Sequence, residues 1–156
     1  MPTATLKELL DREGIKYITI QHSLAYTAQE VAAAAHVPGK EMAKTVVAKL
    51  DGKPALVVLP AGEKVNFDKL RAKTGARDVE LATEQEFAGL FPGCELGAMP
   101  PFGNLYGLDT YVSPTLAADD EIAFNAGTHT EVVKMPYRDF ERVVHPKAID
   151  ASAGAR

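Results

Sequence analysis

Lys44 is the charged residue whose position most suggests chemistry, because it opens a strongly apolar stretch and is followed by Thr45. An ammonium group that is buried without a partner costs free energy. A lysine here therefore either reaches water at a strand edge or is held for a purpose. At the mouth of a pocket it would bind a phosphate or a polarised carbonyl oxygen. The structural alternative is an ordinary surface lysine.

Residues 93–103 form a second candidate, because glycine and proline are dense in this stretch. Regular secondary structure does not persist through so many of them. Glycine lets the backbone approach a ligand closely, proline fixes the path of the chain, and free backbone N–H groups can bind oxyanions or read a base edge. A binding loop is slightly favoured over a tight structural turn.

Residues 125–129, Asn-Ala-Gly-Thr-His, form the third candidate. Asn125 and Gly127 suit a turn, which explains them without a function. His129 is of the type that orients water, bonds a ribose hydroxyl or acts as a general acid or base. Its structural alternative is a partly exposed histidine in a turn.

Several other chemistries lack a sequence pattern. Cys94 is the only cysteine, so neither an internal disulfide nor a multi-cysteine zinc site can form. No histidine pair has the i, i+4 spacing of a metal site, and no glycine pattern matches a nucleotide-binding loop. A serine nucleophile activated by a neighbouring base has no support in the sequence either. We expect no metal and no cofactor, and a reaction that uses water and groups of the substrate.

The elements that must position these residues can be read from local patterns. The first half of the chain predicts a helix at 3–13, a strand at 15–20, a helix from Thr27 to His36, and a β-hairpin of 43–50 and 54–60 around Asp51-Gly52. The second half predicts helices at 66–73, 83–90 and 136–143, strands at 79–81 and 105–112, and a hairpin of 121–125 and 130–135.

These elements predict one α+β domain over residues 1–150, followed by a frayed tail at 151–156. We expect a mixed, largely antiparallel β-sheet or an open barrel, surrounded by several short helices. A chain of 156 residues is long enough to bury a real hydrophobic core.

Composition narrows the class of protein further. Hydrophobic residues make up 46% and charged residues 24%, and no apolar run reaches the roughly 18 residues of a membrane span. The first residues also lack the apolar core of a secretion signal, so we expect a cytoplasmic protein without a membrane partner. The net charge of −4 argues against a protein that coats DNA or RNA, but it allows a local basic patch to grip one RNA end.

Four segments, in this order, resemble the YbaK and prolyl-tRNA synthetase-associated editing family: HSLAYTAQEVAAA, EMAKTVVAKLDGKPALVVLP, GCELGAMPPFGNLYG and NAGTHTEVVKM. The likeness runs from about Leu6 to Val144, and the second and third segments are the most specific. Lys44 matches the family's functional lysine. The loop Gly97-Ala98-Met99-Pro100-Pro101 matches the G-x-x-x-P motif that cradles the terminal adenosine of tRNA, and His129 matches a histidine near the last strands.

The resemblance implies a freestanding aminoacyl-tRNA deacylase, an ester hydrolase that edits mischarged tRNA in trans. Proline tRNA, or a similar tRNA carrying alanine, cysteine or serine, is the implied substrate. Lys44 and His129 would be catalytic, and Thr45, Gly127 and the loop from Gly97 to Pro101 would bind the aminoacyl-tRNA 3′ end. The acidic net charge suggests weak affinity for tRNA, so an aminoacyl-tRNA synthetase or an elongation factor is the expected partner.

Two other classes stay open from the residues alone. A non-catalytic module that binds an aminoacyl or nucleotide group would carry the same lysine and the same loop. A general interaction domain would lack a cleft between Lys44 and Gly97, and its loop at 93–103 would be ordinary surface. Turnover of substrate separates the enzyme from both.

Overall fold

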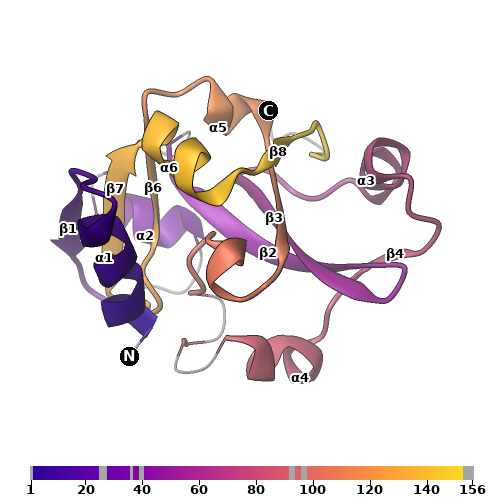
Figure 1. Cartoon of the computed structure of the whole chain (residues 1–156), viewed down its shortest axis with the longest axis horizontal. Helices are drawn as coiled ribbons and strands as arrows, with labels where there is room; N and C mark the ends of the chain where they lie inside the picture. Colours follow the sequence, from indigo (N-terminus) through magenta and orange to yellow (C-terminus); the bar gives the residue numbers. More distant parts are fainter. Residues whose placement is uncertain are drawn as a thin grey trace.

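Helices and strands alternate along the chain, as Figure 1 shows. The computed structural model describes residues 2–24, 28–35, 37–38, 41–91, 94–95 and 98–152. The helices are α1 (Pro2–Arg12), α2 (Ala28–Ala34), α3 (Phe67–Thr74), α4 (Glu84–Phe87), α5 (Pro114–Ala117) and α6 (Tyr137–Val144). The strands are β1 (Ile18–Gln21), β2 (Ala43–Leu50), β3 (Lys53–Pro60), β4 (Val79–Leu81), β5 (Asp109–Val112), β6 (Glu121–Asn125), β7 (Glu131–Pro136) and β8 (Lys147–Ala148).

Strands β2 and β3 form the predicted hairpin, the long twisted ribbon that crosses the molecule in Figure 1. Their pairing is antiparallel from Ala43 opposite Pro60 to Leu50 opposite Lys53. The two turn residues, Asp51 and Gly52, both have positive φ, 52° and 83°. A two-residue hairpin turn of this hand needs left-handed backbone at both positions, which aspartate and glycine tolerate well. The prediction is confirmed.

The hairpin is the centre of a five-stranded sheet with the order β4-β2-β3-β5-β8. Strand β4 pairs antiparallel with β2, whereas β5 and β8 add parallel strands beyond β3. Helix α3 lies against this sheet through Leu70, which is buried. Asn66 caps the helix as predicted, because its Oδ1 accepts a hydrogen bond of 3.0 Å from the Lys69 N–H.

A second, three-stranded antiparallel sheet has the order β1-β7-β6. Helix α6 leaves β7 directly after Pro136 and buries Tyr137, Phe140 and Val144, which lie on one helical face. The two sheets meet where Met42, just before β2, forms a parallel bridge with Ala123 of β6. The start of β2 therefore lies beside β6.

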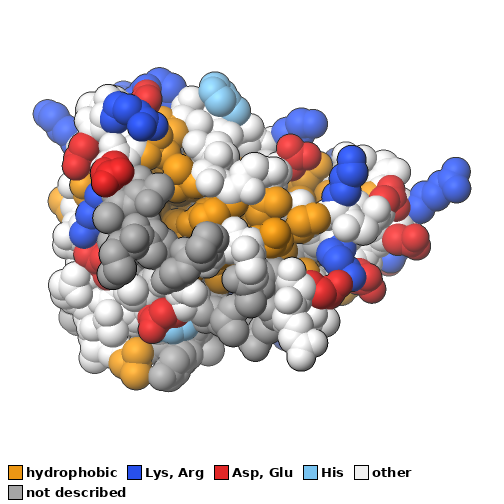
Figure 2. All heavy atoms as spheres, turned by 60° about the horizontal axis from the view of Figure 1, so that its bottom comes forward, with side chains coloured by type: hydrophobic (Ala, Val, Ile, Leu, Met, Phe, Trp, Pro, Cys, Tyr) orange, Lys and Arg blue, Asp and Glu red, His pale blue; other side chains and the backbone are white. Residues whose placement is uncertain are grey.

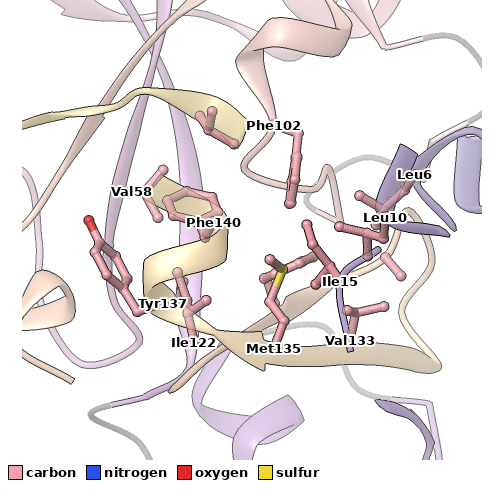
Figure 3. Close-up of a cluster of buried hydrophobic side chains, with 14 of the residues drawn as sticks. Leu6, Leu10, Ile15, Val58, Phe102, Ile122, Val133, Met135, Tyr137 and Phe140 are labelled. Atoms are coloured by element: carbon pink, nitrogen blue, oxygen red, sulfur yellow. The ribbon is translucent and has the colours of Figure 1, made fainter. Parts of the chain in front are cut away.

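The largest core cluster fills the space between the three-stranded sheet, α1 and α6, as Figure 3 shows. Phe102, from the end of the glycine- and proline-rich stretch, is fully buried there. Its ring centroid lies 5.3 Å from that of Phe124 and 5.4 Å from that of Phe140. Aromatic pairs at this separation stabilise a core beyond the area that they bury. The end of this loop is therefore fixed by packing.

The predicted α+β class is confirmed, with mixed pairing divided between two sheets and no closed barrel in the part of the chain described. Two short elements, α5 and β8, were not predicted. The tail prediction was wrong for Ala151 and Ser152: both are buried, and Asn66 N–H donates a hydrogen bond of 2.8 Å to the Ala151 carbonyl oxygen. Residues 153–156 lie outside the described residues.

No helix in the described part of the chain is both long enough and apolar enough to cross a membrane.

Candidate active site

Lys44 is the second residue of β2, opposite Leu59 of β3, and its side chain is half-buried. Alternation along the strand puts it on the same face as Met42 and Val46. Met42 is buried in a cluster with residues of α2, and Val46 packs on the cluster that holds Leu70 of α3. The lysine thus lies between two apolar clusters.

The electrostatic environment of Lys44 disfavours its charge. Partial burial lowers the pKa of the ammonium group, and repulsion by Lys64 lowers it further, while Glu63 acts in the opposite direction. Among the residues that the structure describes, Lys44 makes no ion pair within 4.0 Å. A half-buried cation with a nearby cation and no paired acid is suited to hold an anionic or strongly polarised oxygen.

The predicted binding loop is partly described. Gly97 lies outside the described residues, so the cleft expected between it and Lys44 is not described either. Ala98, Met99, Pro100 and Pro101 are all buried. The Ala98 N–H and carbonyl oxygen are both used within the fold, since the N–H donates to Glu95 at 3.0 Å and the oxygen accepts from Gly127 at 2.9 Å.

Backbone hydrogen bonds hold this loop against the turn between β6 and β7. Glu95 N–H donates to the Gly127 carbonyl oxygen at 2.9 Å, and Gly127 N–H donates to the Ala98 carbonyl oxygen at 2.9 Å. Gly127 has a φ of 102°, a conformation that other residues rarely adopt. The structure therefore brings the second and third sequence candidates into direct contact.

His129 lies in the same junction. It is only 6% exposed, which does not fit the structural alternative of a partly exposed histidine in a turn. Its backbone N–H donates a hydrogen bond of 2.6 Å to Oε1 of Glu95. Glu95 therefore links the loop to the segment between β6 and β7 twice, through its carboxylate to His129 and through its backbone N–H to Gly127.

The end of β6 joins this junction to Lys44. Ala123 N–H donates to the Glu41 carbonyl oxygen at 2.9 Å, next to the bridge between Met42 and Ala123. Two residues further along β6 is Asn125, and two residues after Met42 is Lys44. Lys44 and the turn that bonds the loop therefore both follow the bridge between Met42 and Ala123 within a few residues.

Thr45 and Met99 lie differently from the other predicted site residues. Thr45 follows Lys44 on β2 and so faces the opposite side of the sheet, with Ala43 and Val47. Met99 packs on that same side in a cluster with Val47 and Phe91. Their proposed contact with substrate stays a prediction.

Cys94 is not available as a thiolate nucleophile at neutral pH. Burial raises the pKa of its thiol, and this outweighs the hydrogen bond with the Tyr106 hydroxyl, which acts in the opposite direction. The sulfur and the hydroxyl oxygen are 3.5 Å apart. The thiol form is a poor nucleophile.

Among the described residues, no group of three histidine, cysteine, aspartate or glutamate side chains lies close enough together to hold a metal ion.

Figure 2 turns the lower side of Figure 1 toward the viewer, and hydrophobic side chains form a band across that face between charged groups. An apolar surface of this kind suits an aliphatic side chain or a ring better than a phosphate.

Sequence reasoning missed two residues of this junction, Glu95 and Asn125. Glu95 stands in an irregular loop, where no periodicity marks a side chain that bonds a distant backbone. Asn125 ends β6, as the predicted hairpin required, but its side chain was explained by the turn that follows, and its burial was not predicted. Only the polar character of a residue next to a predicted turn could have drawn attention to it.

A family model described as an aminoacyl-tRNA editing domain matches residues 22–143. The multifunctional Ser/Thr-tRNA deacylase ProXp-y of Escherichia coli (strain K12) is 29% identical over 147 residues, which cover 91% of this chain and 87% of that protein. The proline–tRNA ligase of Staphylococcus saprophyticus is 36% identical over 76 residues, 49% of this chain and 13% of the ligase.

One solved structure, described as a candidate trans-editing enzyme for prolyl tRNA synthetase, has the same fold. It superposes with a TM-score of 0.82 at 21% identity, covering 99% of each chain. At this sequence identity, the structural similarity shows only that the two proteins share a fold.

Proposed function

Because this chain belongs to the family of aminoacyl-tRNA editing domains, we propose that it acts in trans as a separate protein that removes a small non-cognate amino acid from tRNA. Membership of the family makes it an aminoacyl-tRNA deacylase, the enzyme class predicted from the sequence. The single observation that carries the proposal is the half-buried Lys44 beside a junction of backbone groups.

The substrate that we propose is a proline tRNA or a similar tRNA charged with serine, alanine or cysteine. Serine is the first to test, because the E. coli relative is named a Ser/Thr-tRNA deacylase. The match to part of a proline–tRNA ligase supports the link to proline tRNA.

The reaction is the hydrolysis of an ester. A water molecule adds to the ester carbonyl carbon, and the resulting tetrahedral intermediate breaks its bond to the ribose oxygen. The amino acid leaves as a carboxylic acid, and the ribose oxygen takes up the proton that water lost. Lys44 would hold the terminal phosphate or the carbonyl oxygen, where negative charge develops.

The loop and the histidine would position the substrate. Backbone groups between Gly97 and Pro101 would fix the terminal adenosine and the aminoacyl ester; Pro100 and Pro101 offer only carbonyl oxygens, because proline has no N–H. His129 would orient the attacking water or bond a ribose hydroxyl, and a substrate hydroxyl would assist the water. Neither role needs a protein nucleophile.

The test is deacylation of tRNAs charged with serine, threonine, alanine, cysteine and proline, by wild type and by Lys44→Ala. We expect rapid hydrolysis of at least one mismatched species and a loss of about 100-fold or more in Lys44→Ala, the scale of losing one preorganised group for a developing oxyanion. Lys49→Ala is the matched control, because Lys49 lies on the same strand but is paired with Glu80 and Glu86. It should keep the activity.

Binding of tRNA ends without hydrolysis of any species would favour a non-catalytic module that uses the same residues. We also propose a cytoplasmic location and a synthetase or elongation-factor partner that delivers the tRNA. Tight binding of tRNA by the isolated protein at physiological salt would contradict the need for that partner.

A further inference from the structure

Asn125 has a buried side-chain oxygen to which no described residue donates a hydrogen bond. The residue ends β6 opposite Val132 of β7 and is 7% exposed. Its Oδ1 is sealed from solvent, and no donor among the described residues reaches it. Buried acceptors are nearly always paired, so one left open in a native protein calls for an explanation. A turn does not supply one, because the turn begins after Asn125.

The location of Asn125 relates this oxygen to the candidate site. Met42 and Ala123 pair as parallel neighbours, and residues two apart on a strand share a face. In this register Lys44 and Asn125 lie on one face of adjacent strand segments. Two residues after Asn125 along the chain is Gly127, whose N–H donates a hydrogen bond to the carbonyl oxygen of Ala98 in the loop. The amide thus lies between the lysine and the loop.

The chemistry of an amide suits this location. A carboxylate at this point would pair with Lys44 and neutralise it, whereas an amide oxygen accepts a hydrogen bond and leaves the lysine charged. The aminoacyl end of a charged tRNA brings donors of its own, the α-ammonium group and, in serine or threonine, a hydroxyl. An α-ammonium group close to Lys44 needs such an acceptor, because the two cations repel each other.

We infer that Asn125 Oδ1 accepts a hydrogen bond from the aminoacyl group of the substrate and is a specificity-determining residue. The inference rests on the proposed deacylase function. It assigns Asn125 to recognition of the amino acid, a separate task from the phosphate or carbonyl contact of Lys44.

The experiment compares wild type, Asn125→Ala and Asn125→Leu on tRNAs charged with serine, threonine and alanine. Leucine keeps the branched shape of the side chain and removes the acceptor, so it tests the idea if the alanine variant packs poorly. Gln85→Ala is the matched control, because it removes an exposed amide from α4. Thermal unfolding of each protein is measured beside kcat/KM.

We expect at least one of the two Asn125 variants to unfold at the wild-type temperature or above. In that variant kcat/KM should fall about tenfold or more, the effect of losing one hydrogen bond to the substrate. A merely structural amide would lower the unfolding temperature instead. A loss confined to serine and threonine identifies the hydroxyl as the donor. A loss for all three identifies the α-ammonium group, and N-acetylation of the substrate should then reproduce it with wild type.

Wild-type kcat/KM in both variants would overturn the role of Asn125 and leave the deacylase function standing. A loss of activity that only follows a loss of stability in both variants would also overturn it. Failure of the wild-type protein to hydrolyse any charged tRNA would instead overturn the proposed function together with this inference.

Discussion

Removing the Glu95 carboxylate should open the junction between the loop and His129. The perturbation is Glu95→Ala, which deletes the acceptor of the 2.6 Å bond from the His129 N–H and leaves the backbone bonds of residue 95 in place. A hydrogen bond to a charged group contributes about 1.5–3 kcal/mol. Because the Glu95 side chain is exposed, we take the lower end, about 1.5 kcal/mol, which is about tenfold in an equilibrium constant.

Two measurements check this value. Hydrogen exchange of the His129 amide should become about tenfold faster in Glu95→Ala, because the open form of the junction is populated more. Deacylation should lose about tenfold in kcat/KM, since a site displaced by a fraction of an ångström loses its alignment. Glu95→Gln keeps an acceptor oxygen and should recover much of both.

The control is Asp51→Ala at the far end of β2. Asp51 Oδ1 accepts backbone hydrogen bonds from Arg77 at 3.0 Å and Asp78 at 2.8 Å, so this variant also deletes a carboxylate that orders a loop. It should lower stability and leave kcat/KM unchanged. If Glu95→Ala left both His129 exchange and deacylation at wild-type values, or behaved like Asp51→Ala, the positioning role of Glu95 would be refuted.

Two further predictions concern the loop end and the lysine. Gly103→Ala should destabilise the protein by about 2–3 kcal/mol in chemical denaturation, because its Cβ would clash with the Leu108 carbonyl oxygen, whereas Gly89→Ala, with open space around it, should stay within about 0.5 kcal/mol. Lys64→Gln should raise the pKa of Lys44, because it removes a charge that repels the ammonium group. Titration of the Lys44 side chain by NMR would show its charge persisting to higher pH in that variant, and an unchanged or lower pKa would disprove the coupling.

Local signals were sufficient for most local structure. The hairpin turn at Asp51-Gly52, the cap at Asn66 and the capping box of Thr83 and Glu86 each rest on interactions within a few residues. Such interactions are encoded where they occur, so a single sequence reveals them. Helix α5 and strand β8 were missed because segments of four and two residues carry too little periodicity to be recognised.

Contacts between segments that are far apart in the sequence could not be predicted in the same way. The bridge between Met42 and Ala123 and the bonds between Gly127 and the loop join residues far apart in the chain. No pattern within either segment specifies its distant neighbour. For that reason Glu95 and Asn125 were not assigned to the site, and the burial of His129 was not predicted.

The charge distribution reconciles an acidic protein with an anionic substrate. The ion pairs of the described residues tie basic groups to acids in local sets, as with Lys134 between Glu41 and Glu121, and Arg142 between Glu13 and Asp139. Lys44 is in none of these sets, so its positive charge is not cancelled locally. Each phosphate that such an unpaired cation neutralises contributes separately to binding. With a net charge of −4 we expect the protein to bind tRNA weakly as a whole, so that selection among charged tRNAs would depend on the group at the 3′ end.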